Sequence, residues 1–133
     1  MTKIIAIAGK GGSGKTTFAA FTIRYLLEKR GGSILAVDAD PNSNLAEALG
    51  LKISRFIADV LEEVRDGRAI PTGMSRDMFI EYKLREALTE SERVDFLAMG
   101  GPQGPGCYCY ANELLRKKIG MLARQYQYLV VDS

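Results

Sequence analysis

The chain has 133 residues, 47% of them hydrophobic and 26% charged, and its 18 basic and 16 acidic residues give a net charge of +2. This is the composition of an ordinary globular domain and is too apolar for a disordered chain. The small net charge predicts neither a nucleic-acid partner nor a membrane partner, and no apolar run is long enough to span a bilayer. Because histidine is absent, imidazole bases and histidine-containing metal sites are excluded.

The start of the chain lacks a signal-peptide pattern, because Met1 leads almost directly into a strand-like apolar run. The sequence contains only two cysteines. Together these features predict a protein of the reducing cytoplasm.

The first elements predict one strand–helix–strand unit. The apolar run at 3–8 (KIIAIA) predicts a parallel strand covered on both faces, and a glycine-rich turn follows at 9–14. A helix is expected at 16–30 and is ended by the glycines at 31–32, before a second strand at 33–37. Six apolar side chains are expected on the buried face of that helix: Phe18, Phe21, Ile23, Tyr25, Leu26 and Leu27.

The rest of the chain continues this alternation of helices and strands. The expected elements are a short helix at 44–49, a helix at 54–64, a surface loop at 66–77, a strand at 94–99, a loop at 100–106, a helix at 111–125 and a strand at 128–131. Residues 79–88 fit either a helix or an edge strand. The pattern predicts a single α/β domain over residues 1–133, with a mainly parallel sheet flanked by helices.

Residues 9–16 match the phosphate-binding pattern G-x-x-x-x-G-K-[ST]. Glycines allow consecutive backbone N–H groups to surround phosphate oxygens, and the following helix presents its N-terminus to the same anion. Lys15 is placed to reach the β- and γ-phosphates and Thr16 to bind Mg²⁺. The position between a strand and a helix favours an ATP site over a chance glycine-rich turn. The expected nucleotide-binding residues are Gly9, Lys10, Gly11, Gly12, Ser13, Gly14, Lys15, Thr16 and Thr17.

Acidic residues follow two of the predicted strands. Asp38 and Asp40 end the second strand and Asp132 ends the last, where open α/β sheets bind their ligands. We expect Asp38 and Asp132 to act on Mg²⁺ or its water ligands, and Asp40 to position the water that attacks the γ-phosphate. For the segment at 38–42, the alternative is an Asp-Pro turn that caps the next helix.

Cys107 and Cys109 follow a segment with four glycines and two prolines, which predicts an exposed loop. A structural site for a soft metal takes four ligands, typically thiolates or imidazoles, and one chain offers two thiols. A metal such as Zn²⁺ or iron would therefore be shared by two chains, whereas Ni²⁺ accepts fewer protein ligands. Two free cysteines in a loop are the alternative.

The sequence at 10–17 (KGGSGKTT) resembles the deviant phosphate loop of the MinD, ParA and nitrogenase-iron-protein superfamily of P-loop NTPases. In that superfamily the additional lysine, Lys10 here, contacts the nucleotide bound by the partner subunit. The resemblance therefore implies a homodimer that encloses ATP, with catalytic roles for Lys10, Lys15 and Asp40. The segment at 38–42 resembles the first switch of the superfamily, and Asp132 resembles its Walker B acid. A solvated lysine is the alternative for Lys10.

The segments at 37–50 (VDADPNSNLAEALG) and 99–117 (MGGPQGPGCYCYANELLRK) resemble CooC-type accessory ATPases. This implies ATP- and Mg²⁺-dependent nickel insertion into carbon monoxide dehydrogenase, with Ni²⁺ or Zn²⁺ at Cys107 and Cys109.

The residues at 100–102 and 106–107 also resemble the nitrogenase iron protein, which implies an Fe–S cluster bridging two subunits for electron transfer. A MinD/ParA-type positioning ATPase is the third alternative. The superfamily's second switch, further strands and adenine-binding segment follow its Walker B acid and are absent from residues 1–133. We therefore expect weak nucleotide binding and slow or no hydrolysis by this chain.

Overall fold

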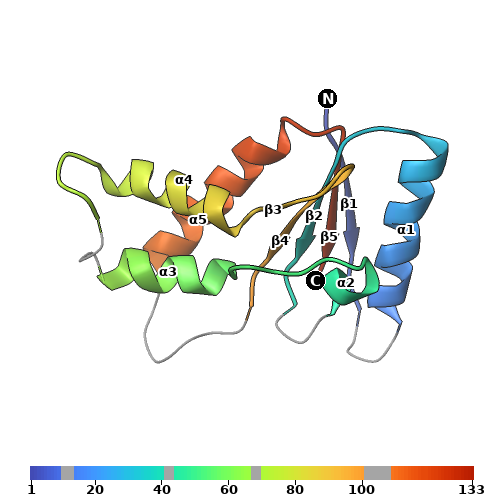
Figure 1. The fold of residues 1–133 in the computed structure, drawn as a ribbon, viewed down its shortest axis with the longest axis horizontal. Helices are drawn as coiled ribbons and strands as arrows, with labels where there is room; N and C mark the ends of the chain where they lie inside the picture. Colours follow the sequence, from blue (N-terminus) through green and yellow to red (C-terminus); the bar gives the residue numbers. More distant parts are fainter. Residues whose placement is uncertain (10–13, 41–43, 67–69, 101–108) are drawn as a thin grey trace.

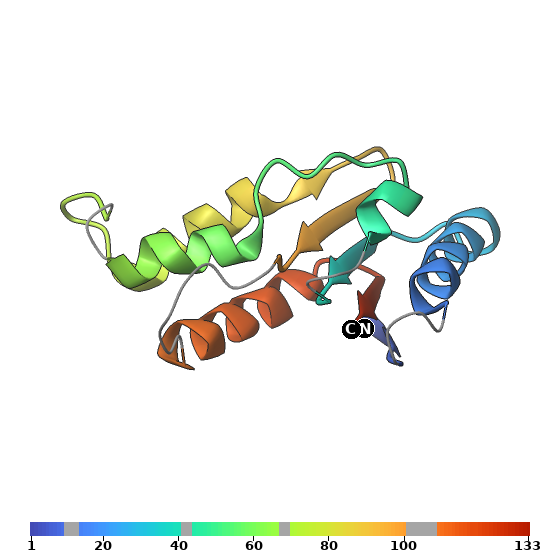
Figure 2. The same cartoon turned by 90° about the horizontal axis from the view of Figure 1, so that it is seen from below.

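The computed structural model describes residues 1–9, 14–40, 44–66, 70–100 and 109–133. Its strands form one sheet with the order β1-β5-β2-β4-β3, and helices flank both faces (Figures 1 and 2). The elements are β1 (Lys3–Ile7), α1 (Lys15–Lys29), β2 (Ile34–Asp38), α2 (Leu45–Ala48), α3 (Ile57–Asp66), α4 (Arg76–Ala87), β3 (Thr89–Glu90), β4 (Val94–Ala98), α5 (Cys109–Ala123) and β5 (Tyr128–Asp132). The predicted α/β fold with a mainly parallel sheet is confirmed.

The order of the strands determines which strand ends meet. β5 lies between β1 and β2, and β2 also pairs with β4; all three pairings are parallel. The carboxyl ends of β1, β5 and β2 therefore lie side by side at one edge of the sheet. β3 pairs antiparallel with β4 and was not among the predicted strands, because two residues are too few to carry a periodic pattern.

The ambiguous segment at 79–88 lies within a helix. Ser75 caps α4 by accepting a hydrogen bond from the N–H of Met78 at 3.1 Å, and this cap sets the helix start inside the predicted 66–77 loop. α5 begins at Cys109, two residues before the predicted start, and α3 begins at Ile57 rather than at 54. Among the described residues, no helix has the length and apolarity needed to cross a bilayer.

The sheet has a hydrophobic core on each face. On one face the strands contribute Leu35, Val37, Leu97 and Leu129 to a core shared with α3, α4 and α5. On the other face they contribute Ile34, Ala36, Phe96 and Val130 to a core shared with α1 and α2. Because side chains alternate along a strand, β2 is buried on both faces, which accounts for its continuous apolar sequence.

The first strand and helix are less buried than the sequence predicts. β1 was expected to be covered on both faces, but only Ile7 of its five residues is buried, and Ile4 is 68% exposed. Only Ile23 and Leu26 of the six side chains expected to face the core from α1 are buried. Ala19 and Ala20 occupy the other inner positions, and the three aromatic side chains of the helix face outward: Phe18, Phe21 and Tyr25.

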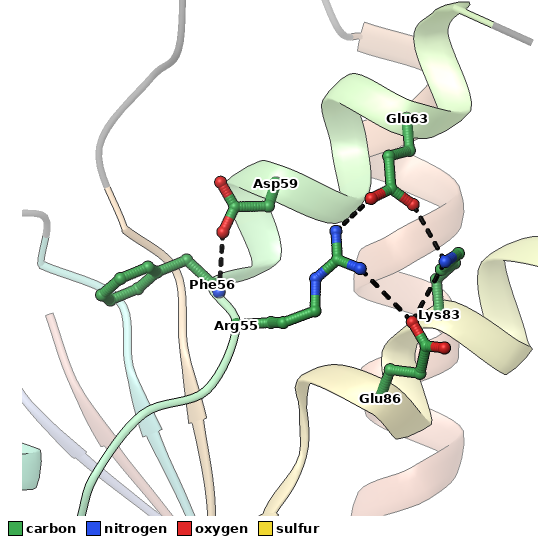
Figure 3. Close-up of polar contacts among 6 residues, drawn as sticks. All are labelled: Arg55, Phe56, Asp59, Glu63, Lys83 and Glu86. Carbon is green, nitrogen blue, oxygen red and sulfur yellow. Dashed lines mark hydrogen bonds and ion pairs between the residues drawn. The ribbon is translucent and has the colours of Figure 1, made fainter. Parts of the chain in front are cut away.

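An ion-pair cluster joins α3, α4 and the residue Arg55 that precedes α3 (Figure 3). Arg55 pairs with Glu63 of α3 and Glu86 of α4, and Lys83 lies 3.1 Å from a carboxylate oxygen of each. Burial acts to raise the pKa of Glu63, but its bonds to Arg55 and Lys83 outweigh burial and lower this pKa below its ordinary value. The cluster therefore stays charged at neutral pH and fixes the start of α3.

The start of α3 in turn contacts the end of β4. The N–H of Ala58 donates to the carbonyl of Met99 at 2.9 Å, and the N–H of Met99 donates to the carbonyl of Asp38 at 2.8 Å. Gly100 has φ +73, and a Cβ there would lie 2.8 Å from the Cβ of Phe56. These contacts require glycine at 100 and connect α3 to the strand end that carries Asp38.

The hydroxyl of Tyr126 donates to Asp95 Oδ2 of β4 at 2.6 Å. Burial is the main cause that raises the pKa of Tyr126 above its ordinary value, and the bond to Asp95 raises it further. The folded protein thus holds this proton more tightly than the unfolded chain, which stabilises the fold below about pH 10. We expect this contribution to be lost as pH rises above about 10, so the free energy of unfolding should fall less steeply with alkaline pH in Tyr126→Phe.

Urea unfolding at about pH 8 and about pH 10.5 measures this effect. Tyr82→Phe is the matched control, because Tyr82 is 54% exposed. An equal alkaline loss of stability in the parent protein and in Tyr126→Phe would contradict the assignment.

Candidate functional site

The phosphate-loop residues that the structure describes lie between β1 and α1. Gly9 follows β1, and Gly14 precedes α1 with φ +84, a left-handed conformation that favours glycine. No acidic residue lies in the first turn of α1 and no side chain caps it, so its N–H groups and dipole are suited to an anion. Lys15, Thr16 and Thr17 form this first turn.

Asp38 and Asp132 end neighbouring strands in matching positions. The register of β2 and β5 pairs the two residues directly, and their exposed fractions are 5% and 0%. The backbone beyond β2 is held at the same place, because the N–H of Ala39 donates to the carbonyl of Asp132 at 2.8 Å. The N–H of Asp40 donates to Asp38 Oδ1 at 3.2 Å. Acidic groups buried this close together favour a cation nearby.

Lys15 supplies a positive charge to these carboxylates. Its ammonium group donates to Asp40 Oδ2 at 2.7 Å and to Asp132 Oδ1 at 3.0 Å, and its side chain is only 8% exposed. The hydroxyl of Thr16 donates to the other oxygen of Asp132 at 3.2 Å. The bond to Asp40 is the main cause that raises the pKa of Lys15; it and the bond to Asp132 outweigh desolvation. Lys15 therefore stays charged and joins the first turn of α1 to both acidic strand ends.

The structure thus brings together five of the residues that the sequence predicts for the site: Lys15, Thr16, Asp38, Asp40 and Asp132. Carboxylate and hydroxyl oxygens are the ligands that Mg²⁺ prefers, so the donor set fits this ion. The bond of Lys15 to Asp40 was not foreseen, because residues 25 positions apart carry no pairing signal in a single sequence.

Five of the other predicted site residues are not placed by the structure. Lys10, Gly11, Gly12, Ser13 and Cys107 lie outside the described residues. Cys109 is the first residue of α5, so this half of the cysteine pair lies on a helix rather than in the predicted loop. Within the described part of the chain, no group of three or more cysteine and acidic residues could hold a metal ion.

A cavity of about 380 Å³ lies between the sheet and α5 and was not predicted. Its walls come from β2, β5 and α5 and from the residues that follow β2 and β4. All but one of its lining residues are apolar: Val37, Ala39, Met99, Arg116, Ile119, Leu129 and Val131. Arg116 contributes the one ionisable side chain among them. No sequence motif marks this cavity, because residues from four separate segments form it.

Comparisons with known proteins agree with this geometry. Residues 4–118 match the model of the CobQ/CobB/MinD/ParA nucleotide binding domain. An uncharacterised ATP-binding protein of Methanocaldococcus jannaschii is 44% identical over 133 residues, covering 98% of this chain and 52% of the relative. The carbon monoxide dehydrogenase accessory protein CooC of Rhodospirillum rubrum is 32% identical over 143 residues, covering 96% of this chain and 53% of the relative.

Among solved structures, the septum site-determining protein MinD of Pyrococcus horikoshii, in complex with Mg-ADP, matches with a TM-score of 0.60 and 28% identity. That match covers 99% of this chain and 49% of MinD. The chain thus spans about half the length of the relatives it matches. The phosphate-loop residues, the parallel sheet and the match over residues 4–118 lead to one assignment: the chain belongs to the CobQ/CobB/MinD/ParA family of P-loop nucleotide-binding domains.

Proposed function

We propose that residues 1–133 form one P-loop ATPase domain that acts as an ATP-dependent metal-insertion factor, with nickel as its cargo and carbon monoxide dehydrogenase as its client. The observation that carries the ATPase part is the contact of Lys15 with both Asp40 and Asp132 at the start of α1. This contact brings together, at the N-terminus of one helix, an ammonium group that can bind a triphosphate and carboxylates that can position a water molecule.

Phosphoryl transfer to water depends mainly on positioning and on neutralisation of charge. Lys15 would exchange Asp40 for the β- and γ-phosphates of ATP, and Thr16, Asp38 and Asp132 would hold Mg²⁺. The bound Mg²⁺ would neutralise charge on the phosphate oxygens. Asp40, released from Lys15, would then orient the attacking water. Phosphate binding and the release of Asp40 are therefore one exchange of partners by a single ammonium group.

The metal-insertion part is supported by two observations. Cys107 and Cys109 give one chain two thiols and, with no histidine in the sequence, too few ligands for a four-coordinate soft metal. The CooC relative is named as an accessory protein of carbon monoxide dehydrogenase. We infer that two chains share the metal between their cysteine pairs. Lys10 would reach the nucleotide of the other subunit, so that ATP binding closes this homodimer.

Elemental analysis of anaerobically purified protein, combined with its mass in solution, tests the proposal. We expect nickel to bind to a dimer in the presence of ATP and to be lost in the double variant Cys107→Ser/Cys109→Ser. The matched control is Met78→Ser/Met121→Ser, which removes two exposed sulfur-bearing side chains on α4 and α5. Full metal loading of a monomer without ATP, or of the cysteine double variant, would refute it.

A second candidate, an ATPase that bridges an Fe–S cluster for electron transfer, is supported by Gly100, Gly101 and Pro102 with Cys107. Visible absorption that bleaches on reduction would favour this candidate over nickel insertion. ATP-dependent binding to liposomes or DNA that survives Cys107→Ser would favour the positioning ATPase instead.

A further inference from the structure

The first turn of α1 contacts both carboxylate oxygens of Asp132. The ammonium group of Lys15 donates to Oδ1 at 3.0 Å, and the hydroxyl of Thr16 donates to Oδ2 at 3.2 Å. The same ammonium group donates to Asp40 Oδ2 at 2.7 Å. Lys15 therefore holds two acidic residues at once, one at the end of β5 and one just beyond β2.

These contacts lie where solvent screens charge poorly. The side chain of Asp132 is 0% exposed and that of Lys15 is 8% exposed. A buried carboxylate without a partner is costly, because it has left water and gains no compensating charge or hydrogen bond. Asp132 therefore needs a positive partner in every state of the protein, and in the chain without nucleotide Lys15 provides it.

A divalent cation competes with Lys15 for Asp132. The ammonium group already lies 3.0 Å from one carboxylate oxygen, and two positive charges that share one buried carboxylate repel each other strongly. Asp38 lies beside Asp132 on the neighbouring strand, so removal of the ammonium group would leave three carboxylates close together. Three carboxylates form a donor set that attracts Mg²⁺, whereas the same set with a bound ammonium group attracts it less.

We propose that the contacts of Lys15 with Asp40 and Asp132, here called the lysine lock, exclude free divalent cations from the site until a triphosphate binds Lys15. This inference rests on the proposed function, which assigns ATP and Mg²⁺ to the site, and it adds the regulation of cation binding. Once the phosphates hold the ammonium group, Asp132 exchanges it for Mg²⁺ and stays paired.

The lysine lock couples the binding of triphosphate to the binding of the cation. Such coupling is reciprocal, so each ligand raises the affinity for the other by the same factor. It acts in addition to any direct bond between Mg²⁺ and the phosphates. Loss of the ammonium group should therefore create a cation site that needs no nucleotide. A lysine that serves only to bind phosphate would not have this effect.

Binding of Mn²⁺ without nucleotide tests the lysine lock. Mn²⁺ takes the same oxygen ligands as Mg²⁺, and electron paramagnetic resonance measures its unbound fraction. We expect Lys15→Met to bind Mn²⁺ about 100-fold more tightly than the parent protein, because the like charge is removed. Lys15→Arg keeps the charge and should bind Mn²⁺ as weakly as the parent protein does.

Lys118→Met is the matched control for Lys15→Met. Lys118 also contacts two carboxylates, Asp77 at 2.9 Å and Glu81 at 3.5 Å, but both of these are half-exposed. This variant should bind Mn²⁺ no more tightly than the parent protein, because water solvates the two carboxylates that lose their partner. In Lys15→Met/Asp132→Asn the gained affinity should disappear, which would identify Asp132 as a ligand.

Thermal unfolding provides a second readout and shows that each variant is folded. A ligand that binds only the folded protein raises its Tm. Mg²⁺ should therefore raise the Tm of Lys15→Met and leave the Tm of the parent protein and of Lys15→Arg unchanged. If Lys15→Met does not fold, Lys15→Gln takes its place, because its uncharged amide can still donate a hydrogen bond to Asp132.

Tight binding of Mn²⁺ by the parent protein without nucleotide would overturn the lysine lock, as would equally weak binding by the folded, uncharged variants of Lys15. Either result leaves the proposed function standing if MgATP binds to the parent protein in a calorimetric titration. Absence of MgATP binding would instead refute the proposed function, and with it the release of Lys15 by phosphate.

Discussion

Replacing Lys15 by alanine is expected to weaken MgATP binding by about 100-fold, which corresponds to ~2.7 kcal/mol. The same change should lower the free energy of unfolding of the nucleotide-free protein by about 3 kcal/mol. The first effect follows from loss of the ammonium group that would bind the β- and γ-phosphates. The second follows from the burial of Asp132, which is fully buried and loses the cation 3.0 Å from its carboxylate.

The double variant Lys15→Ala/Asp40→Asn separates these two effects. Removal of the charge on Asp40 relieves its repulsion with Asp132, so the double variant should recover part of the lost stability. It should not recover ATP affinity, because no group replaces the ammonium. Isothermal titration calorimetry with MgATP and urea unfolding measure the two quantities.

Lys118→Ala is the matched control for Lys15→Ala. Lys118 also contacts two carboxylates, Asp77 at 2.9 Å and Glu81 at 3.5 Å, but these lie on the exposed surface between α4 and α5. This variant should bind MgATP normally. Unchanged ATP affinity in Lys15→Ala would contradict the proposal that Lys15 binds the phosphates of ATP.

Replacing Asp40 by asparagine is expected to lower the rate of ATP hydrolysis by about 100-fold without weakening MgATP binding. The amide keeps the shape of the side chain but orients the attacking water poorly. Binding should be equal or tighter, because Asp40 bonds Lys15 at 2.7 Å in the nucleotide-free protein and so competes with the phosphates. A fall in rate with preserved affinity identifies a group that acts after binding.

Single-turnover hydrolysis of labelled ATP by excess protein measures the rate even if turnover is slow. Asp59→Asn is the control, because Asp59 accepts a hydrogen bond from the N–H of Phe56 at the start of α3, away from the phosphate loop. If Asp40→Asn hydrolyses ATP at the parent rate, Asp40 does not position the water.

Local sequence signals were sufficient to place Lys15 and Thr16 at the start of a helix and acidic residues at the ends of two strands. Gly14, Lys15 and Thr16 are consecutive, so their positions follow from the start of a single helix. The continuous apolar sequence of β2 likewise identified a strand buried on both faces.

The same reasoning failed for β1 and α1. The sequence of β1 is similar to that of β2 in its apolar content, yet only Ile7 of β1 is buried, whereas all of β2 is buried. On α1, the small side chains Ala19 and Ala20 face the sheet, whereas Phe18 and Phe21 face outward. A prediction from hydrophobicity alone turns the larger side chains toward the sheet, because hydrophobicity does not measure the space available between helix and sheet.

The sequence was enough to identify the fold class and the nucleotide-binding family, because a phosphate-loop motif and strand–helix periodicity depend on residues close together in the chain. Only the tertiary structure decided that β5 lies between β1 and β2, and this order brings Asp132 beside Asp38 and within reach of Lys15. Strand order and edge exposure depend on packing between distant segments, and a single sequence carries no signal for those contacts.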